Sequence, residues 1–379
     1  MGTQSSCSCE LRLPLHTAGN RVYCEQPDPA TREETTVTTP ESASDITLDW
    51  LKSALPRARP GCEPVSAEVE PDAGGPSLLG KIARVRLDYA APDCGPSSVI
   101  VKFQARSTDW EARIYRLLSG AQVRSVPRLY HACENGTLIM EDLSPARTGS
   151  QVRGCTLGQA REVLSILAEI HGCFWDDPRV PSIEPLRFAA VIGVNMEQCW
   201  KLFKGRYRER MGDLAEVFEW MWRNAETVSA HRLSEPGTLF HGDVHVENLL
   251  FNDTRKHGPV LIDWQLAARG LAANDVSFFL VKSLPVRERR AHEERLLRGY
   301  WKELPRRVRA GYGFDRFQLD YRACVTRSMV SAVMMVDPRF VDRPDQLDLA
   351  DLLARRVIAA VRDLDPAGAL CELQARGVL

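Results

Sequence analysis

The sequence predicts an α+β fold in which a small strand-rich lobe precedes a larger, mostly helical lobe. Its 379 residues exceed one ordinary compact domain, so two lobes or domains are expected. Short apolar segments that alternate with polar residues, as half-buried strands do, gather before residue 143. From about residue 155 onward, apolar residues recur at helical spacing. We therefore predict a disordered tail over 1–45, an N-terminal lobe over 46–143 and a C-terminal lobe over 144–379.

The composition is that of an ordinary globular protein, with 44% hydrophobic and 26% charged residues. The net charge of −1 gives no global field that would favour nucleic acid or an anionic membrane as a partner. No apolar run reaches the roughly 18 residues of a membrane-spanning helix. The N-terminus lacks the basic and apolar segments of a secretory signal, and the eleven cysteines are scattered without a C-x-x-C pair. We expect reduced thiols and a cytoplasmic protein of undetermined oligomeric state.

The first elements of the N-terminal lobe follow a tail that is rich in Ser, Thr, Pro and Glu and has no apolar periodicity. Order is expected to begin at "DITLDWLKSALP", a short helix that Asp45 can cap and Pro56 ends. The alternating segments "KIARVRLDY" (81–89) and "SSVIVKFQ" (97–104) predict two strands, and turn residues lie between them.

The elements expected from residue 109 onward are mostly helices, with two short strands among them. The segment 109–120 has helical spacing and ends in Gly, and "TLIMEDL" (137–143) predicts a further strand. After residue 155, only "LLF" and "VLID" interrupt the helical pattern. Each of these two short strands adjoins a polar motif.

The polar loop, residues 241–248, lies in "LFHGDVHVENLLFN" between two apolar runs. Asp243 precedes the strand "NLLF", Asn248 enters it, and Asp263 ends the next apolar run. Two adjacent short strands would bring these three side chains to one end of a hairpin. A carboxylate and an amide oxygen are ligands that Mg²⁺ accepts, together with substrate phosphates. The remaining carboxylate can accept a proton from a hydroxyl group.

The order D-x-x-x-x-N followed by a second Asp is that of the catalytic and metal loops of protein kinases. Here H-G-D stands where protein kinases carry H-R-D, and D-W-Q stands where they carry D-F-G. In many protein kinases this Arg receives a phosphorylated activation loop, so its absence argues against such regulation. By itself His241 is interpreted as a core histidine, and His245 is expected to pack or hydrogen-bond within the loop.

Two residues upstream of the polar loop are candidates for binding ATP. Lys102 lies in the middle of the apolar strand "VIVKF", and a role at ATP phosphates would explain a lysine that faces a cleft. Glu111, nine residues later, begins a helix and can pair with Lys102, with Asp109 as the alternative acid.

Two further segments are candidates for nucleotide contacts. Glycines 74, 75 and 80 do not form G-x-G-x-x-G, and a phosphate cradle or a simple turn are both open there. The strand "LIMEDL" ends where a kinase hinge would lie, so backbone groups from Glu141 to Leu143 are the expected adenine contacts.

With these motifs, the chain resembles the aminoglycoside phosphotransferase and choline kinase branch of the protein-kinase-like fold. More narrowly, it is similar to the ecdysteroid-kinase-like group. The matching stretches span about 97 to 280: "VIVKF", "WEARIYRLL", "LIMEDLSPARTGSQ", "LAEIHGCFWDDP", "LFHGDVHVENLLF", "VLIDWQLAARG" and "NDVSFFL". The resemblance implies a bilobal kinase-like fold and ATP- and Mg²⁺-dependent phosphorylation of a small-molecule hydroxyl group.

The resemblance also implies roles by position. Asp243 is the expected catalytic base, and Asn248 and Asp263 are the expected Mg²⁺ ligands. Lys102 would hold the ATP phosphates with Glu111 steering it, and Asp275 would brace the polar loop, supported by His241 and His245.

The acceptor is left open among natural products, antibiotics, amino alcohols and sterol-like alcohols. Only about a dozen residues separate Asp263 from Asp275, and no A-P-E motif occurs, which favours a small acceptor over a protein. The alternatives are a catalytically silent kinase-like scaffold and, less favoured, a protein kinase. The tryptophans of the helical lobe could line an aromatic pocket, although core packing is the stronger interpretation for each of them.

Overall fold

The computed structural model describes residues 38–57, 59–71, 80–104, 109–182, 194–251, 258–341 and 344–378. These residues belong to one compact unit, Thr38–Leu379. The tail up to residue 37, and Gly74 and Gly75 of the candidate phosphate loop, lie outside the described residues. The predicted tail and lobe boundaries stay predictions.

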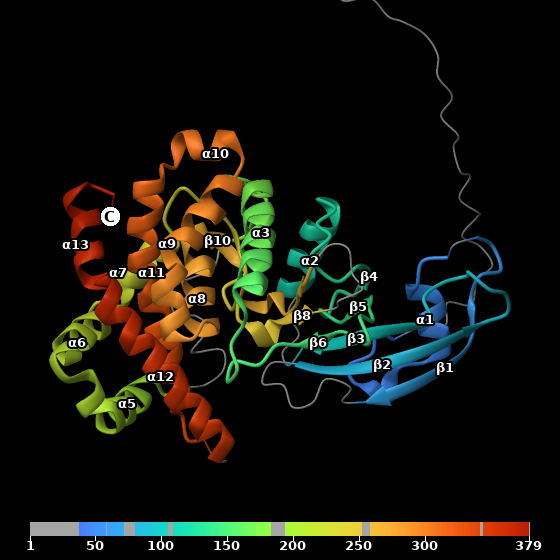
Figure 1. Ribbon diagram of the computed structural model, residues 1–379. Coiled ribbons are helices and arrows are strands. Elements are labelled where there is room, and N and C mark those ends of the chain that lie inside the picture. Colours follow the sequence, from blue (N-terminus) through green and yellow to red (C-terminus); the bar gives the residue numbers. More distant parts are fainter. Residues whose placement is uncertain are drawn as a thin grey trace, which may run out of the picture. The chain divides into compact units, whose positions relative to one another are not determined.

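A five-stranded antiparallel sheet forms the N-terminal lobe (Figure 1), with the strand order β1-β2-β3-β5-β4. Helix α2 follows β3 in the chain, and α1 precedes the sheet. The elements are α1 (Leu48–Ala54), β1 (Pro64–Pro71), β2 (Gly80–Tyr89), β3 (Ser98–Gln104), α2 (Trp110–Gly120), β4 (Leu129–Ala132) and β5 (Leu138–Glu141).

The two faces of β3 meet different partners because its side chains alternate. Val99, Val101 and Phe103 are buried in the apolar cluster that also holds Trp50 and Leu51 of α1. Ile100 and Lys102 belong to the opposite face. The alternation seen in the sequence therefore turns the lysine away from the α1 side of the sheet.

The N-cap of α1 differs from the prediction. Thr47, not Asp45, caps this helix, and its Oγ1 accepts a hydrogen bond from the Trp50 amide at 3.2 Å. Asp45 instead ends the preceding 3₁₀ turn η1 (Ala43–Asp45), where its carboxylate accepts from the Ser42 amide at 2.8 Å.

Helices dominate the C-terminal lobe (Figure 1). They are α3 (Leu157–Cys173), α5 (Met196–Met211), α6 (Ala215–Arg223), α7 (Ala225–Arg232), α8 (Ala272–Ser283), α9 (Val286–Glu303), α10 (Arg306–Gly311), α11 (Phe314–Met334), α12 (Pro344–Leu364) and α13 (Pro366–Ala375). Every residue of α8 is buried, so this helix forms the centre of the lobe.

Short strands and turns carry the polar loop between these helices. Strands β6, β8 and β9 form one small antiparallel sheet, and β7 and β10 form another. Of these, β8 and β9 are the two strands predicted around the motif. The elements are β6 (Arg147–Thr148), η2 (Gly212–Leu214), β7 (Thr238–Phe240), η3 (Val246–Asn248), β8 (Leu249–Phe251), β9 (Val260–Leu261), η4 (Trp264–Leu266) and β10 (Ala268–Gly270). The strand-rich lobe followed by a helical lobe confirms the predicted α+β fold class.

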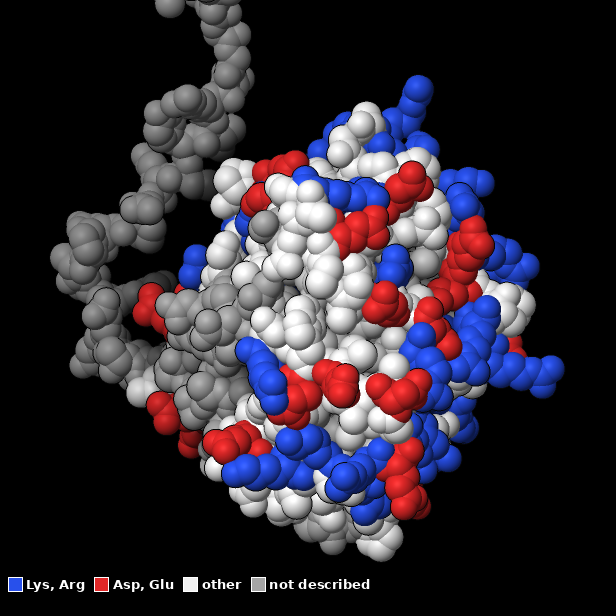
Figure 2. Space-filling model, turned by 90° about the vertical axis from the view of Figure 1, so that its left-hand side faces the viewer, with Lys and Arg blue, Asp and Glu red and all other residues white. Residues whose placement is uncertain are grey.

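Core packing accounts for the tryptophans that the structure buries. Trp264 is fully buried, and Trp200 stacks on Trp222 with ring centroids 5.1 Å apart inside an apolar cluster of the C-terminal lobe. Helix α9, which is rich in arginine, forms a mixed surface, because its Arg298 pairs with Glu294. Positive and negative side chains are interspersed on the face drawn in Figure 2. None of the described helices is long and apolar enough to cross a membrane.

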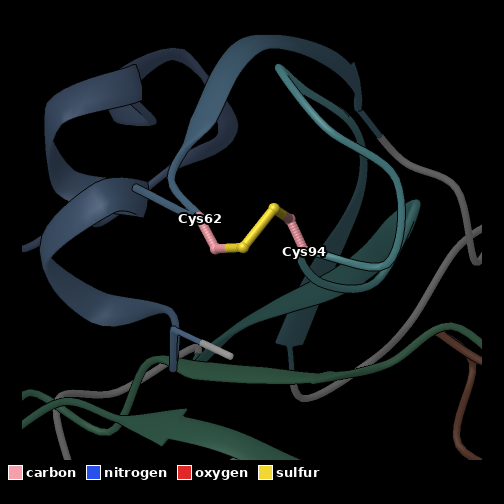
Figure 3. Close-up of a disulfide and its surroundings, with 2 residues drawn as sticks. All are labelled: Cys62 and Cys94. Carbon is pink, nitrogen blue, oxygen red and sulfur yellow. A yellow bond between two sulfur atoms is a disulfide. The ribbon is translucent and has the colours of Figure 1, made fainter. Parts of the chain in front are cut away.

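The expectation of reduced thiols is wrong for one pair, because Cys62 and Cys94 form a disulfide (Figure 3). Cys62 lies between α1 and β1, and Cys94 lies in the connection between β2 and β3. The bond therefore joins two connections of the N-terminal lobe that are 32 residues apart. Scattered cysteines give no sequence signal for this pairing. The cytoplasmic location stays a prediction.

Candidate functional site

The polar loop gathers its side chains around Asp243. The Asn248 Nδ2 donates to the backbone oxygen of Asp243 at 2.9 Å and to its Oδ2 at 3.3 Å. His245 Nε2 lies 3.5 Å from the same Oδ2. The Asp243 side chain remains 30% exposed, so its carboxylate can reach a bound molecule. The sequence predicted packing or hydrogen bonding within the loop for His245, and the structure places its ring beside the Asp243 carboxylate.

Burial and nearby positive groups act oppositely on Asp243. Burial acts to raise the pKa of this carboxyl group. The electrostatic influence of His245, Arg327 and Lys282 outweighs that effect and holds the pKa well below its usual range. Asp243 is therefore ionised at neutral pH, as an acceptor of a hydroxyl proton must be.

Asp275 holds the backbone at the start of the polar loop. Its carboxylate accepts hydrogen bonds from the amides of His241 at 2.6 Å and Gly242 at 2.9 Å. The Asp275 side chain is buried, and its Oδ2 lies 3.3 Å from Nε2 of His171 on α3. This geometry suits a brace for the loop, and the role of Asp275 stays a prediction.

His241 joins the polar loop to the strand that ends at Asp263. Its Nδ1 accepts from the Asp243 amide at 3.2 Å, so the Nε2 proton is the one donated to the Ile262 carbonyl oxygen at 2.9 Å. The ring also packs edge-on against Trp264, with centroids 4.7 Å apart. His241 is fully buried and satisfied, as the core interpretation predicts.

Gly242 occupies the position at which protein kinases carry Arg. Its φ of +85° lies in the left-handed region that favours glycine. A Cβ atom built on Gly242 would lie 2.5 Å from the carbonyl oxygen of Leu266. The close approach of these two loops leaves no room for a side chain.

Lys102, Glu111 and Asp263 form a buried three-residue contact. The Nζ of Lys102 donates to Glu111 Oε1 at 2.8 Å and to Asp263 Oδ1 at 2.5 Å. The side chains are 11%, 1% and 27% exposed, respectively. Burial alone would lower the pKa of Lys102, but the two carboxylates outweigh it and raise the pKa above its ordinary value.

Glu111 also fixes the segment after Asp263. Its Oε1 accepts from the Trp264 amide at 3.0 Å, and its Oε2 accepts from Gln104 Nε2 at 2.6 Å. Between the two acids that the sequence offered, Glu111 therefore contacts Lys102. Asp109 is the N-terminal neighbour of α2, and its side chain makes no capping hydrogen bond.

Two oxygen-bearing side chains adjoin neighbouring strands, since Asn248 directly precedes β8 and Asp263 follows β9. The Ile262 amide donates to the Asn248 carbonyl oxygen at 3.0 Å, which places Asn248 next to the residue before Asp263. Within the described chain, no three His, Cys, Asp or Glu side chains cluster as a metal site. An amide oxygen with one carboxylate fits Mg²⁺, which keeps waters and takes further oxygens from substrate phosphates.

The hinge candidates lie at the end of β5. The Glu141 amide donates to the Arg128 carbonyl oxygen at 2.9 Å, so sheet pairing uses this amide. The Leu143 carbonyl oxygen accepts from the Ala146 amide at 2.9 Å. An adenine contact by the backbone of Glu141 or Leu143 stays a prediction.

Two residues near the site, Arg327 and Lys282, lie outside the sequence motif and were not predicted from it. Arg327 Nη2, from α11, donates to the Gly242 carbonyl oxygen at 3.2 Å. Lys282 lies in the last turn of α8 and is 3% exposed. Only a lysine within the otherwise apolar stretch "FFLVKSL" hinted that a charge is buried there.

Comparison with known proteins agrees with this geometry. A family model described as the phosphotransferase enzyme family matches residues 93–311, more than half of the chain. A choline/ethanolamine kinase family protein from Mesorhizobium loti matches with a TM-score of 0.50 at 16% identity, covering 82% of this chain and 92% of that chain. A protein described as an aminoglycoside phosphotransferase, from Ralstonia eutropha, also has a TM-score of 0.50, at 14% identity, covering 83% and 97%. No curated protein matches the chain.

At these identities, the two solved structures show the fold. The segment matched by the family model includes Lys102, the polar loop, Asp263 and Asp275. The narrower similarity to the ecdysteroid-kinase-like group stays a prediction. Because the match covers more than half of the sequence, the chain belongs to the phosphotransferase enzyme family.

Proposed function

We propose that this phosphotransferase transfers the γ-phosphoryl group of ATP to a hydroxyl group of a small molecule, with Mg²⁺ as its metal ion. The observation that carries the proposal is the convergence of Lys102, Glu111 and Asp263 from three separate elements onto one ion-paired contact. This arrangement, with Asp243 and Asn248 on the adjoining loop, contains the groups that phosphoryl transfer requires.

Each group has a distinct task in the proposed reaction. Asp243, ionised and partly exposed, orients the acceptor hydroxyl and accepts its proton. Lys102, positioned by Glu111, neutralises charge on the nucleotide phosphates. Asn248 and Asp263 would hold the metal ion, which supplies charge neutralisation at the transferred phosphoryl group. Asp275 and His241 keep the loop backbone in place.

The direct test measures ADP release from Mg-ATP with aminoglycosides, amino alcohols, sterols and polyketide alcohols as acceptors. Asp243→Asn should lower kcat by about 10²- to 10⁴-fold while the KM for ATP changes little, because only the proton acceptor is lost. Asp49→Asn is the matched control, since that side chain is 84% exposed on α1. Equal turnover by Asp243→Asn would refute the assigned role.

Binding of Mg-ATP separates the remaining interpretations. A protein that binds Mg-ATP and shows no acceptor-dependent release needs a wider acceptor panel. A protein that does not bind Mg-ATP would favour a silent scaffold. Phosphorylation of protein substrates, with none of the small acceptors used, would favour a protein kinase.

A further inference from the structure

Two positive side chains approach the polar loop from the helices beneath it. Arg327 on α11 donates to the carbonyl oxygen of Gly242, the residue directly before Asp243. The Phe278 ring connects Arg327 to a second cation, because Arg327 Cζ lies 4.9 Å and Lys282 Nζ lies 5.2 Å from its centroid. Both cations therefore contact one aromatic ring next to the loop.

Both cations donate to neutral groups of the described residues. Lys282 donates to the neutral Ser331 hydroxyl at 2.8 Å, and Arg327 donates to a backbone carbonyl. No carboxylate in the described ranges lies within 4.0 Å of the charged nitrogens of either residue. A buried cation without a carboxylate partner costs stability. Retaining two of them beside a reactive group indicates a role in function.

The electrostatic influence of the pair reaches the reacting region. Burial is the largest effect on Lys282 and lowers its pKa to about 8, although the negative charge of Asp243 acts to raise that pKa. Burial also lowers the pKa of Arg327, again against the attraction of Asp243 and Asp275. Glu247 also attracts Lys282 and Arg356 repels it, so the pair lies among charges of both signs beside Asp243.

We infer that Lys282 and Arg327 form an anion-recognition subsite beside Asp243, so that the acceptor alcohol carries an anionic oxygen group, such as a carboxylate, close to its reacting hydroxyl. The inference rests on the proposed function and narrows its acceptor class. Arg327 is partly exposed and contacts the anionic group, whereas Lys282 is 3% exposed and adds its charge from behind. The same charges repel ammonium groups, so cationic amino alcohols and aminoglycosides are poor acceptors.

The test uses matched sets of alcohols that differ in one group: a carboxylate, a neutral amide or an amine. ADP release with Mg-ATP gives kcat/KM for each member. The wild-type protein should prefer the carboxylate over the amine by at least about tenfold, since a charge reversal next to two cations acts on binding directly. Preference for the amine member would overturn the inference.

Two variants locate the preference. Lys282→Met keeps the length of the side chain and removes its charge, and Arg327→Gln keeps a donor for the Gly242 carbonyl oxygen. Each should lower the carboxylate-to-amine ratio by about tenfold while the neutral amide changes much less. Lys201→Met, whose side chain is 71% exposed on α5, should leave the ratio unchanged. A ratio that stays at the wild-type value in both folded variants would also overturn the inference.

Stability gives a readout that does not depend on turnover. If Lys282 serves ligand recognition, Lys282→Met should melt at or above the wild-type temperature, because a buried charge is removed. A variant that melts several degrees lower, with an unchanged ratio, would show a structural lysine instead. If no acceptor is turned over, the Mg-ATP binding measurement decides the proposed function. Calorimetric binding of the carboxylate members to wild type and to Lys282→Met then decides the subsite separately, and absence of wild-type binding would refute it.

Discussion

At the scale of single residues, Gly242 shows how sterics constrain the chemistry of the polar loop. Its backbone conformation is one that side chains rarely adopt, and the Leu266 carbonyl oxygen occupies the space that a Cβ would need. The residue therefore keeps two loops in close approach, with Asp243 on one and Asp263 at the start of the other.

Gly242→Ala should destabilise the protein by about 1–3 kcal/mol, because the new Cβ is strained by φ and clashes with backbone. It should also lower kcat, since Asp243 is the next residue. Gly205→Ala is the control: this glycine lies within α5, and nothing lies within 4 Å of the position that the new methyl group would take. That change should be neutral or stabilising. Chemical denaturation of both variants would contradict the argument if the two curves shift equally.

The sequence motif predicted the residues that meet at this scale but not their surroundings. Asp243, Asn248 and Asp263 could be proposed as site residues because their order and apolar flanks are local features. Arg327 could not, because it lies more than 80 positions from Gly242 in the chain and contacts it only through tertiary packing.

At the scale of elements, the site depends on how α2 lies against β3. Strand alternation turns Lys102 away from the α1 side of the sheet. Glu111, in the first turn of α2, accepts a hydrogen bond from the Lys102 ammonium group and pairs with it. Glu111 further binds the Trp264 amide, so this one helix positions both the lysine and the backbone after Asp263.

Glu111→Gln should raise the KM for ATP and lower kcat/KM by about 10²-fold, because the neutral amide no longer steers Lys102. Steady-state kinetics with varied ATP would measure the change. Asp109→Asn removes a carboxylate two residues away that makes no capping hydrogen bond, and it should leave both constants near wild type. A similar loss in both variants would mean that general charge, and not the Lys102 contact, matters.

Element positions were predictable from periodicity, whereas a helix start was not fully so. The strand that holds Lys102 and the helix that begins near Glu111 follow from apolar spacing alone. The cap of α1 was assigned to Asp45 although Thr47 fills it. Both residue types are good caps and lie two positions apart, so the local pattern does not distinguish them.

At the scale of the whole molecule, the Cys62–Cys94 disulfide links connections that the chain order separates. Both cysteines are buried beside the sheet of the N-terminal lobe. Cysteine spacing could not predict the bond, because pairing depends on how β1, β2 and β3 bring their connecting loops together. Non-local pairing of this kind is what a single sequence conveys least.

Replacing both cysteines by serine should lower the free energy of unfolding by about 3 kcal/mol, since the closed loop constrains the unfolded chain. Thermal melts with and without a thiol reductant would measure the effect, and the reductant should lower the melting temperature of wild type but not that of the double-serine variant. Cys371→Ser, at an exposed free cysteine, is the control and should melt as wild type does with and without reductant. A wild-type melt that ignores the reductant would contradict the expected contribution.

The contact between Lys102 and Asp263 has a consequence for the order in which ligands add. The ammonium group of Lys102 already neutralises the Asp263 carboxylate. A divalent cation that binds without a nucleotide must therefore compete with Lys102 for this carboxylate. Nucleotide phosphates offer Lys102 another partner and release the carboxylate from that competition. Under the proposed function, nucleotide and cation should therefore bind with positive cooperativity, and by thermodynamic reciprocity each should raise the affinity for the other to the same degree.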